Sequence, residues 1–277
     1  MKHCADAPLV LFYKGILDDS DSKNIAIVGT RKATEMGKKR VDTLLHELAE
    51  TGYHPNIISG LAYGIDITAH TACIHYGLKA QAVLGHGLHM VYPASHKNMA
   101  EKILEQGGAL ISEFPTCAQI LPTNFLQRNR IVAGMSEAIL VAESPIKGGA
   151  MSTARQALSY NREVMAIPGR PEDPTFAGCN LLIKQNIAAL VENIKDLLRI
   201  LNWPPLPTGP YQMSLDLFPI TNNEVLLLEI LLKRGEQNID QLHQLTRIPV
   251  HDLSVLLLKL ELEGHVMQLP GNCYTLI

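Results

Sequence analysis

The segment at residues 124–130 combines an aromatic ring, two guanidinium groups and side-chain amides. Phe125 can stack on a nucleobase, while Arg128 and Arg130 can pair with phosphates, which is how proteins hold single-stranded nucleic acid. Asn129 adds a hydrogen-bonding amide between the two arginines. Because the apolar residues 131–133 follow, we expect the arginines in a loop and the first turn of a helix, where backbone N–H groups also attract anions. The same residues also fit an ordinary helix start whose arginines pair with surface carboxylates.

Glycines and polar residues follow two expected strands, residues 24–28 and 56–59. Glycine permits close backbone approach, and an arginine directly after it can present a fork of donors to a phosphate. The second strand leads through two glycines to a helix expected near Asp66, which is typical of a backbone anion nest, with Asp66 capping the helix. The candidate binding residues at these strand ends are Gly29, Thr30, Arg31, Ser59, Gly60 and Gly64.

Motifs of dedicated catalytic machinery are absent from the sequence. The glycine-rich residues 147–153 precede a helix but lack the P-loop order G-x-x-x-x-G-K-[ST], and no G-x-G-x-x-G follows the first strand. Neither G-x-S-x-G nor H-E-x-x-H occurs. Glu113 and Glu143 follow strands and are candidate bases, but a base needs a partner within reach, and the sequence indicates none. We therefore expect a binding site and not an enzyme, with no cofactor.

Six short apolar runs alternate with helical patterns between residues 24 and about 200. The first helix is expected at residues 34–51, with a threonine N-cap, apolar residues at helical spacing and a stop at Gly52. Strands that are apolar throughout and alternate with helices indicate a parallel sheet covered on both faces. The fold class is therefore α/β, an extended Rossmann-like sheet whose binding crevice lies at the carboxyl ends of the strands. The expected strands are residues 24–28, 56–59, 80–84, 109–112, 138–142 and 164–167.

The end of the chain has a different pattern. The proline-rich residues 202–210 can neither continue a helix nor join a ladder, so they indicate a linker. Helical patterns at 221–234, 239–246 and 250–263, followed by a hairpin of residues 266–269 and 273–277, predict a small winged-helix domain. We expect a DNA-binding domain at residues 1–201, a linker at 202–217 and the winged helix at 218–277.

Charge places any phosphate binding in the first part of the chain. The net charge of −3 is not that of a generally basic nucleic-acid binder. From Tyr211 onward there are four basic and eight acidic residues, a net charge of −4. The remainder has 20 basic and 19 acidic residues, a net charge of +1. A phosphate site must therefore be a local cluster within the first ~200 residues.

Other features limit the location and chemistry of the protein. No apolar run approaches the ~20 residues of a membrane span, and the start leads into no signal core, so we expect a cytoplasmic protein without membrane contact. Five scattered cysteines predict neither a disulfide framework nor a zinc site. His86 and His89 have no cysteine or acid at ligand spacing, so we expect no metal.

With these residues laid out, the chain resembles the bacterial DNA-processing protein A family (DprA, also called Smf). The matching segments run in family order over roughly residues 8 to 200, and the acidic tail resembles the optional winged helix of the family. Leu126 stands where many members have proline, and Asn186 where glycine is usual. The matching lead-in starts almost at Met1, so we expect the N-terminal helical domain of many members to be absent. The matching segments are residues 8–15, 27–31, 59–66, 69–70, 83–93, 110–113, 125–130, 149–154, 167–169 and 178–184.

The resemblance implies a homodimer that binds single-stranded DNA without strong sequence preference. It also implies a role in natural transformation, in which the protein protects incoming strands and helps to load the RecA recombinase. Arg31, Phe125, Arg128, Arg130 and Lys184 fall on family positions that face the strand or shape its groove.

Two other interpretations compete with this one. Cytokinin-activating phosphoribohydrolases, which cleave nucleoside monophosphates, are similar in fold and carry a loop P-G-G-x-G-T-x-x-E. Here residues 147–155 lack the glutamate which that activity needs at the helix start. In the tail, the expected third helix has one lysine against three acids, so we expect it to contact protein or form a dimer and not to contact DNA.

Overall fold

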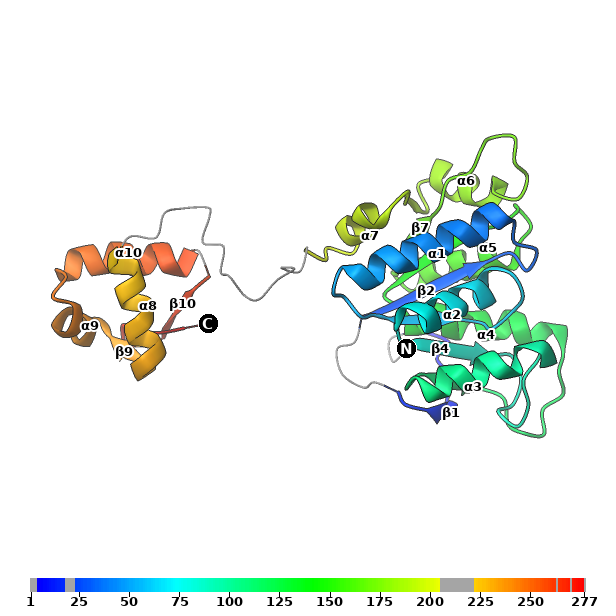
Figure 1. Cartoon of the computed structure of the whole chain (residues 1–277), viewed down its shortest axis with the longest axis horizontal. Coiled ribbons are helices and arrows are strands. Elements are labelled where there is room, and N and C mark those ends of the chain that lie inside the picture. The colour runs from blue at the N-terminus through cyan, green and yellow to red at the C-terminus, as the bar shows by residue number, and fades with distance from the viewer. Residues whose placement is uncertain (1–3, 18–22, 205–221, 263, 270, 277) are drawn as a thin grey trace. The chain divides into compact units, whose positions relative to one another are not determined.

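The computed structural model describes residues 4–17, 23–204, 222–262, 264–269 and 271–276 (Figure 1). The chain separates into two compact units, Met1–Thr208 and Gly209–Ile277. In the described part of the chain, no helix combines the length and the apolar character needed to cross a membrane.

The larger unit is built on an eight-stranded sheet in the order β1-β5-β4-β3-β2-β6-β7-β8. All neighbouring strands are parallel except β1, which pairs antiparallel with β5. Together with the winged helix of the smaller unit, described below, this confirms the predicted fold class. The strands are β1 (Phe12–Gly15), β2 (Asn24–Gly29), β3 (Asn56–Ser59), β4 (Ala80–Leu84), β5 (Ala109–Ser112), β6 (Ala138–Glu143), β7 (Glu163–Ala166) and β8 (Ala189–Leu190).

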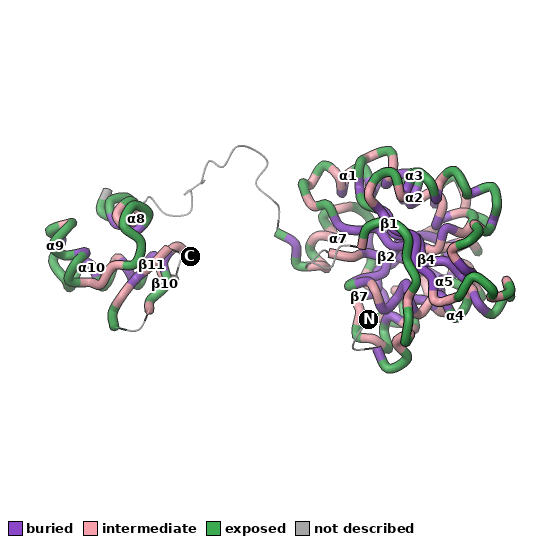
Figure 2. The backbone as a smooth tube through the Cα atoms, turned by 90° about the horizontal axis from the view of Figure 1, so that it is seen from below, coloured by how far each residue is buried: buried purple, intermediate pink, exposed green. Residues whose placement is uncertain are grey.

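Helices cover both faces of this sheet, which is why its inner strands, β2 to β7, are largely buried on both sides. Figure 2 shows α1, α2 and α3 on one side of the strands and α4 and α5 on the other. The helices are α1 (Glu35–Glu50), α2 (Ile65–Tyr76), α3 (Lys97–Glu105), α4 (Pro122–Met135), α5 (Gly149–Ser159), α6 (Ala177–Lys184) and α7 (Ile194–Ile200), with a 3-10 turn η1 (Ala94–His96) before α3.

The helix predicted at residues 34–51 is confirmed as α1. The Thr34 side chain accepts a hydrogen bond from the backbone N–H of Gly37, which satisfies one free donor of the first turn. Gly52 follows the helix with φ +78°, a left-handed conformation that favours glycine. The apolar face packs against the sheet, and its buried side chains are Val41, Leu44, Leu45 and Leu48.

The expected position of the two arginines relative to their helix is wrong. Helix α4 begins at Pro122, so Phe125, Arg128 and Arg130 lie inside the helix and not in a loop and a first turn. Proline suits the first helical position, because its fixed φ is already helical and its missing N–H would have no partner there. Asn124, Arg128 and Ile131 share the buried face at i, i+4 and i+7.

Two strands of the larger sheet were not expected from the sequence. All four residues of β1 are exposed, so this edge strand lacks the alternation that identifies a half-buried strand. The other missed strand, β8, is two residues long. The six predicted strands are all present, with ends that differ by at most one residue.

The smaller unit confirms the predicted winged helix. Its helices are α8 (Asn222–Arg234), α9 (Ile239–Thr246) and α10 (Val250–Leu262), and the strands β9 (Gln237–Asn238), β10 (Val266–Leu269) and β11 (Cys273–Leu276) form a sheet in the order β10-β11-β9. Asn238 and Gln241 form a reciprocal capping box at the start of α9. The core includes Leu227, Leu231, Leu242, Leu253, Leu257 and Leu260.

The first residues of the expected linker pack against the larger unit. Trp203 is 5% exposed, and its ring lies 5.0 Å from that of Tyr53. The Lys23 ammonium is 4.3 Å from the centroid of each ring. The Tyr53 hydroxyl donates to the carbonyl of Pro204 at 2.7 Å. The rest of the expected linker, residues 205–217, lies outside the described residues, and the boundaries at 201/202 and 217/218 remain predictions.

Candidate nucleic-acid interface

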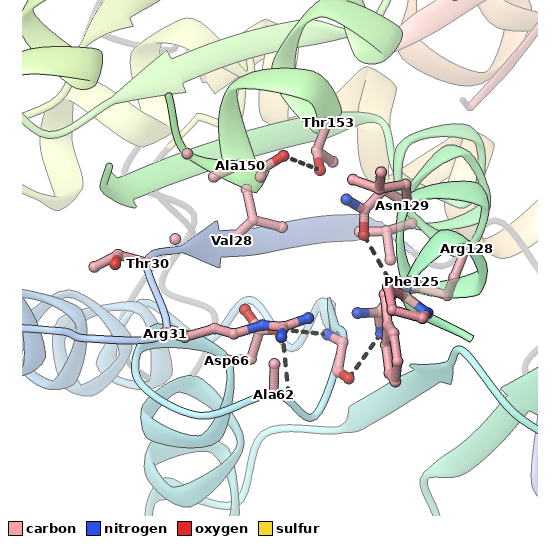
Figure 3. A pocket seen from close by; sticks show the side chains of 17 residues that line it. Val28, Thr30, Arg31, Ala62, Asp66, Phe125, Arg128, Asn129, Ala150 and Thr153 are labelled. Carbon is pink, nitrogen blue, oxygen red and sulfur yellow. Dashed lines mark hydrogen bonds between the residues drawn. The ribbon is translucent and has the colours of Figure 1, made fainter. Parts of the chain in front are cut away.

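A cavity of about 230 Å³ opens at the carboxyl ends of β2, β3 and β6. From β2 the chain builds β3, β4 and β5 on one side and then crosses back to build β6, β7 and β8 on the other. Doubly wound sheets bind ligands at such a reversal. The volume is below the ~300–1,000 Å³ of sites that enclose a small molecule, so it suits one part of a longer ligand. Figure 3 shows the lining residues, which are Val28, Gly29, Thr30, Arg31, Gly60, Ala62, Asp66, Pro122, Phe125, Leu126, Arg128, Asn129, Val132, Gly148, Gly149, Ala150 and Thr153.

Arg31 lies at the mouth of this cavity, in a loop that is hydrogen-bonded to Glu143 on both sides of the arginine. The Thr30 backbone N–H donates to the carbonyl of Glu143 at 2.7 Å. The fully buried Glu143 carboxylate then accepts from the Thr34 backbone N–H at 3.0 Å and from its hydroxyl at 3.1 Å. The exposed Arg31 guanidinium carbon lies 5.4 Å from the centroid of the Phe125 ring and makes no ion pair within the described residues. A cation and an aromatic face therefore meet at the sheet edge.

The anion nest expected after β3 is already filled by a side chain of the protein. One oxygen of the buried Asp66 carboxylate accepts from the backbone N–H of Gly60 at 3.2 Å and from that of Ala62 at 3.4 Å. Burial raises the pKa of Asp66, and the nearby Arg128 opposes that shift. Asp66 is also not the helix cap, because the N-cap of α2 is Gly64. The expectation that these amides bind an external anion is therefore wrong.

Ser59 and Gly64 act in the architecture of the loops. The buried Ser59 hydroxyl donates to the carbonyl of Ile27 at 2.6 Å, which ties β3 to β2. Gly64 has φ +77°, and a Cβ there would lie 2.2 Å from the Thr30 carbonyl oxygen. Neither residue lines the cavity. Because Ser59 is fully buried, its expected role as a DNA contact is wrong, whereas that of Gly64 stays a prediction.

Arg128 supports the cavity from beneath. Its guanidinium donates to the carbonyl of Gly60 at 2.7 Å and to that of Val83, and the residue is only 4% exposed. Its Nε also donates to the side-chain oxygen of Asn129 at 3.2 Å. The expected phosphate contact of Arg128 is therefore wrong, because its donors are directed to the carbonyls that end β3 and β4. Arg128 links α4, which carries Phe125, to those two strands.

Arg130 and Lys184 lie outside the cavity. Arg130 pairs with Glu113 and also donates to the carbonyl of Asp6. The alternative of a helix arginine paired with a carboxylate thus applies to Arg130. Lys184 is exposed at the last residue of α6. The cavity brings Arg31 and Phe125 together but does not include Arg130. The expectation that all three residues share one groove is therefore wrong for Arg130.

The start of α5 belongs to the site, although its residues were not among the predicted contacts. Gly148, Gly149, Ala150 and Thr153 line the cavity, and Ala150 and Thr153 lie on the side opposite Arg31 and Asp66 (Figure 3). The N-cap Gly148 provides no side-chain acceptor, so the helix dipole and free N–H groups of the first turn favour an anion. The exposed Lys147 precedes this turn. The glycine pair before a helix was the signal for this part of the site.

Neither candidate base is placed for catalysis. Glu143 is engaged by the Thr34 loop, and Glu113 pairs with Arg130 and accepts from Gln127. Among the described lining residues, Asp66 is the one carboxylate, and two backbone N–H groups engage it. Arg155 stands where the phosphoribohydrolase loop would need its glutamate. The arrangement supports binding of an anionic, base-bearing ligand.

A buried imidazole, that of His70, lies near Arg128. His70 of α2 is fully buried, and neither ring nitrogen has a hydrogen-bond partner within the described residues. Burial, with the positive charge of Arg128 and the neighbouring His96, lowers the pKa of His70 to about 3. His70 is therefore neutral at physiological pH.

Comparison with known proteins agrees with the resemblance seen in the sequence. A family model described as DNA recombination-mediator protein A matches residues 1–202, and one described as the DprA winged helix domain matches residues 227–272. The chain belongs to the DprA/Smf family.

Its DprA/Smf relatives match most of the chain. Protein Smf of Escherichia coli is 37% identical over 275 residues, which cover 96% of this chain and 71% of that protein. The X-ray structure of DNA processing protein A from Streptococcus pneumoniae has a TM-score of 0.66 at 36% identity and covers 72% of this chain and 68% of that chain. DNA processing protein A from Helicobacter pylori, whose structure is described for its single-stranded DNA binding mode, has a TM-score of 0.64 at 29% identity and covers 73% and 90% of the two chains.

The structure accommodates both departures from the usual DprA/Smf sequence. Asn186 has φ +54°, and asparagine is among the few residues besides glycine that tolerate this left-handed conformation. Leu126 lies in the interior of α4, where proline would remove a helical N–H donor. Its side chain is 55% exposed and lines the cavity. Leucine therefore adds apolar surface next to Phe125.

Proposed function

We propose that this protein binds single-stranded DNA at the carboxyl edge of β2, β3 and β6. The observation that carries the proposal is the shared cavity of Arg31 and Phe125, whose guanidinium and ring lie 5.4 Å apart. Proteins that hold unpaired strands combine cations for the phosphates with rings for the bases. The recombination-mediator family of the chain and the single-stranded DNA binding described for the Helicobacter pylori protein support the same ligand.

Different groups contact the phosphates and the bases in this proposal. Arg31 pairs with one phosphate, and the first turn of α5 at Gly149 and Ala150 receives another, with Lys147 adding positive charge. Phe125 stacks on a base, and Leu126 lies beside it. The buried Arg128 contacts no DNA and holds the ring-bearing helix in place.

The same groups explain a preference for unpaired strands. A base inside a duplex is stacked on both faces, so it has no free face for Phe125, whereas every unpaired base has one. Asn129 cannot direct its side-chain oxygen freely to a base edge, because Arg128 donates to it. We therefore expect little dependence on sequence.

The proposal is tested by fluorescence anisotropy with labelled oligo-dT at two salt concentrations. We expect Phe125→Ala to weaken binding by about 1–3 kcal/mol, the usual value of one stacked base. Arg31→Gln should weaken binding and reduce the slope of log K against log salt by about 0.7, the value of one phosphate contact on a single strand. Arg199→Gln, an exposed arginine of α7, is the matched control. Unchanged affinity in both site variants would refute the interface.

The wider role follows from family membership. We propose that the protein acts as a homodimer in the cytoplasm during natural transformation, protects incoming strands and helps to load the RecA recombinase. Nuclease digestion of bound oligo-dT tests protection, and RecA filament formation on coated DNA tests loading. Sedimentation tests the dimer. Loss of loading in Arg31→Gln, with an unchanged dimer, would connect the cavity to the wider role.

We further propose that the winged helix contacts protein or takes part in dimer formation. Its third helix, α10, exposes Asp252 together with Val255 and Leu258, which are 58% and 57% exposed. Phosphate repels the Asp252 carboxylate, and the apolar side chains of Val255 and Leu258 offer a phosphate no hydrogen-bond donor. A chain truncated after Pro204 should keep its oligo-dT affinity. If the truncated chain stays folded and dimeric but loses that affinity, the winged helix contacts DNA.

A further inference from the structure

We propose that Tyr92 is a second base-stacking residue, which extends the DNA interface beyond the cavity onto the loop after β4. This inference rests on the proposed single-stranded DNA binding. The centroid of the Tyr92 ring lies 5.8 Å from that of Phe125, with 45° between the ring planes, and Tyr92 is 49% exposed. It does not line the cavity, so it would bind the part of the strand that leaves it.

The spacing of the two rings determines how bases can meet them. A base inserted between two rings needs about 7 Å, twice the roughly 3.4 Å spacing of stacked bases. At 5.8 Å and 45°, Phe125 and Tyr92 leave no room for such an insertion. A base must therefore stack on a part of either ring that does not face the other ring. The Arg31 guanidinium at 5.4 Å and the Tyr92 ring at 5.8 Å both lie next to the Phe125 ring, so a phosphate contact and a second stacking surface are available to neighbouring nucleotides.

Hydrogen bonds within the protein support the Tyr92 loop on both sides of the ring. The backbone N–H of Tyr92 donates to Nε2 of the buried His86 at 3.1 Å, and the other ring nitrogen of His86 lies 3.0 Å from the Gly87 carbonyl oxygen. On the other side of Tyr92, the Tyr63 hydroxyl lies 3.1 Å from Ser95 Oγ. These contacts hold the backbone on both sides of the ring. A ring on a fixed backbone loses little conformational entropy when a base stacks on it.

An ordinary exposed tyrosine is the alternative, and Tyr13 provides the comparison. Tyr13 is 57% exposed on β1, the outermost strand, with β5, β4 and β3 between it and β2. Tyr92 has similar exposure, but its ring is next to Phe125. Proximity to the ring of the proposed site therefore distinguishes Tyr92 from a surface residue without a ligand.

Substitution at both tyrosines tests the inference by oligo-dT anisotropy. Tyr92→Ala should weaken binding about fivefold or more, the lower end for one stacked base, while Tyr92→Phe and Tyr13→Ala should leave it within about twofold. The loss should disappear on a tract of equal length in which most nucleotides are abasic. An equal loss on both ligands would show that Tyr92 only shapes the loop and would overturn the inference. If Phe125→Ala and Arg31→Gln reduce affinity but Tyr92→Ala does not, the inference fails and the proposed function stands.

A tryptophan reporter gives a second readout that does not depend on the alanine variant. The chain has one tryptophan, Trp203, which is buried and gives a constant background. Saturating oligo-dT should quench the emission of Tyr92→Trp, while Tyr13→Trp and the unaltered chain should change little. If anisotropy reports full binding and the Tyr92→Trp emission stays constant, the inference is overturned. If the unaltered chain does not bind oligo-dT at all, both the inference and the proposed function are overturned.

Discussion

Replacing Arg128 by methionine distinguishes a structural arginine from a phosphate-binding one. The change removes the donors of the partly buried Gly60 carbonyl and the buried Val83 carbonyl and leaves Asp66 without its positive neighbour. An unsatisfied buried group costs about 1–3 kcal/mol, two carbonyls lose their donor, and the buried Asp66 loses the favourable influence of a positive charge. We therefore expect Arg128→Met to lower the free energy of unfolding of the larger unit by about 3–5 kcal/mol. Adding Asp66→Asn should recover part of this loss, because it removes the uncompensated charge.

Urea unfolding followed by Trp203 emission measures this loss, because Trp203 packs on the larger unit. With an m-value of about 2 kcal/mol per M, the midpoint should fall by about 1.5–2.5 M. The folded variant should bind oligo-dT more weakly, but its salt slope should equal that of the unaltered chain, because Arg128 contacts no phosphate. The opposite result, in which stability changes by less than about 0.5 kcal/mol and the slope falls by about 0.7, would refute the structural role.

Two further predictions concern residues around Arg128. Because the pKa of His70 is lowered to about 3, the unfolded chain binds the proton more readily below pH 6.5, and stability should fall as the pH drops. Between pH 7.5 and 5, protonation of His70 in the unfolded chain should lower the free energy of unfolding by about 2 kcal/mol. In urea titrations over this pH range, the free energy of unfolding of His70→Leu should therefore fall by about 2 kcal/mol less than that of the unaltered chain. The raised pKa of Asp66 acts in the opposite direction, but Asp66 is present in both proteins and its contribution cancels in the comparison. An equal pH dependence in both proteins would therefore contradict the prediction for His70. A Cβ at Gly60 would lie 2.3 Å from the Arg128 guanidinium, so Gly60→Ala should cost about 1–3 kcal/mol of stability. Gly149→Ala meets nothing within 4 Å and is the control; equal melting temperatures for the two variants would contradict the proposed crowding.

The sequence predicted the elements whose signals are local. The Thr34 cap, the apolar face of α1 and the stop at Gly52 depend on neighbouring residues, and the structure confirms them. The six fully apolar strands likewise predicted a sheet covered on both faces. Edge strand β1 was missed because its exposed residues carry no periodic signal. The start of α4 carries a weak local signal, because its N-cap, Leu121, offers no side-chain acceptor and Pro122 alone marks the first turn.

The sequence alone also identified the residue types of the site, including the ring of Phe125 and the Arg31 that follows β2. Only the tertiary structure decided which of the charged groups are free. Arg128 and Arg130 are separated by two positions, yet one supports strand carbonyls and the other pairs with Glu113. Asp66 fills the amide nest that appeared open to an anion. Caps and periodicity are properties of a few adjacent residues, whereas the partner of a charge depends on which distant segments the packed sheet brings within hydrogen-bonding distance.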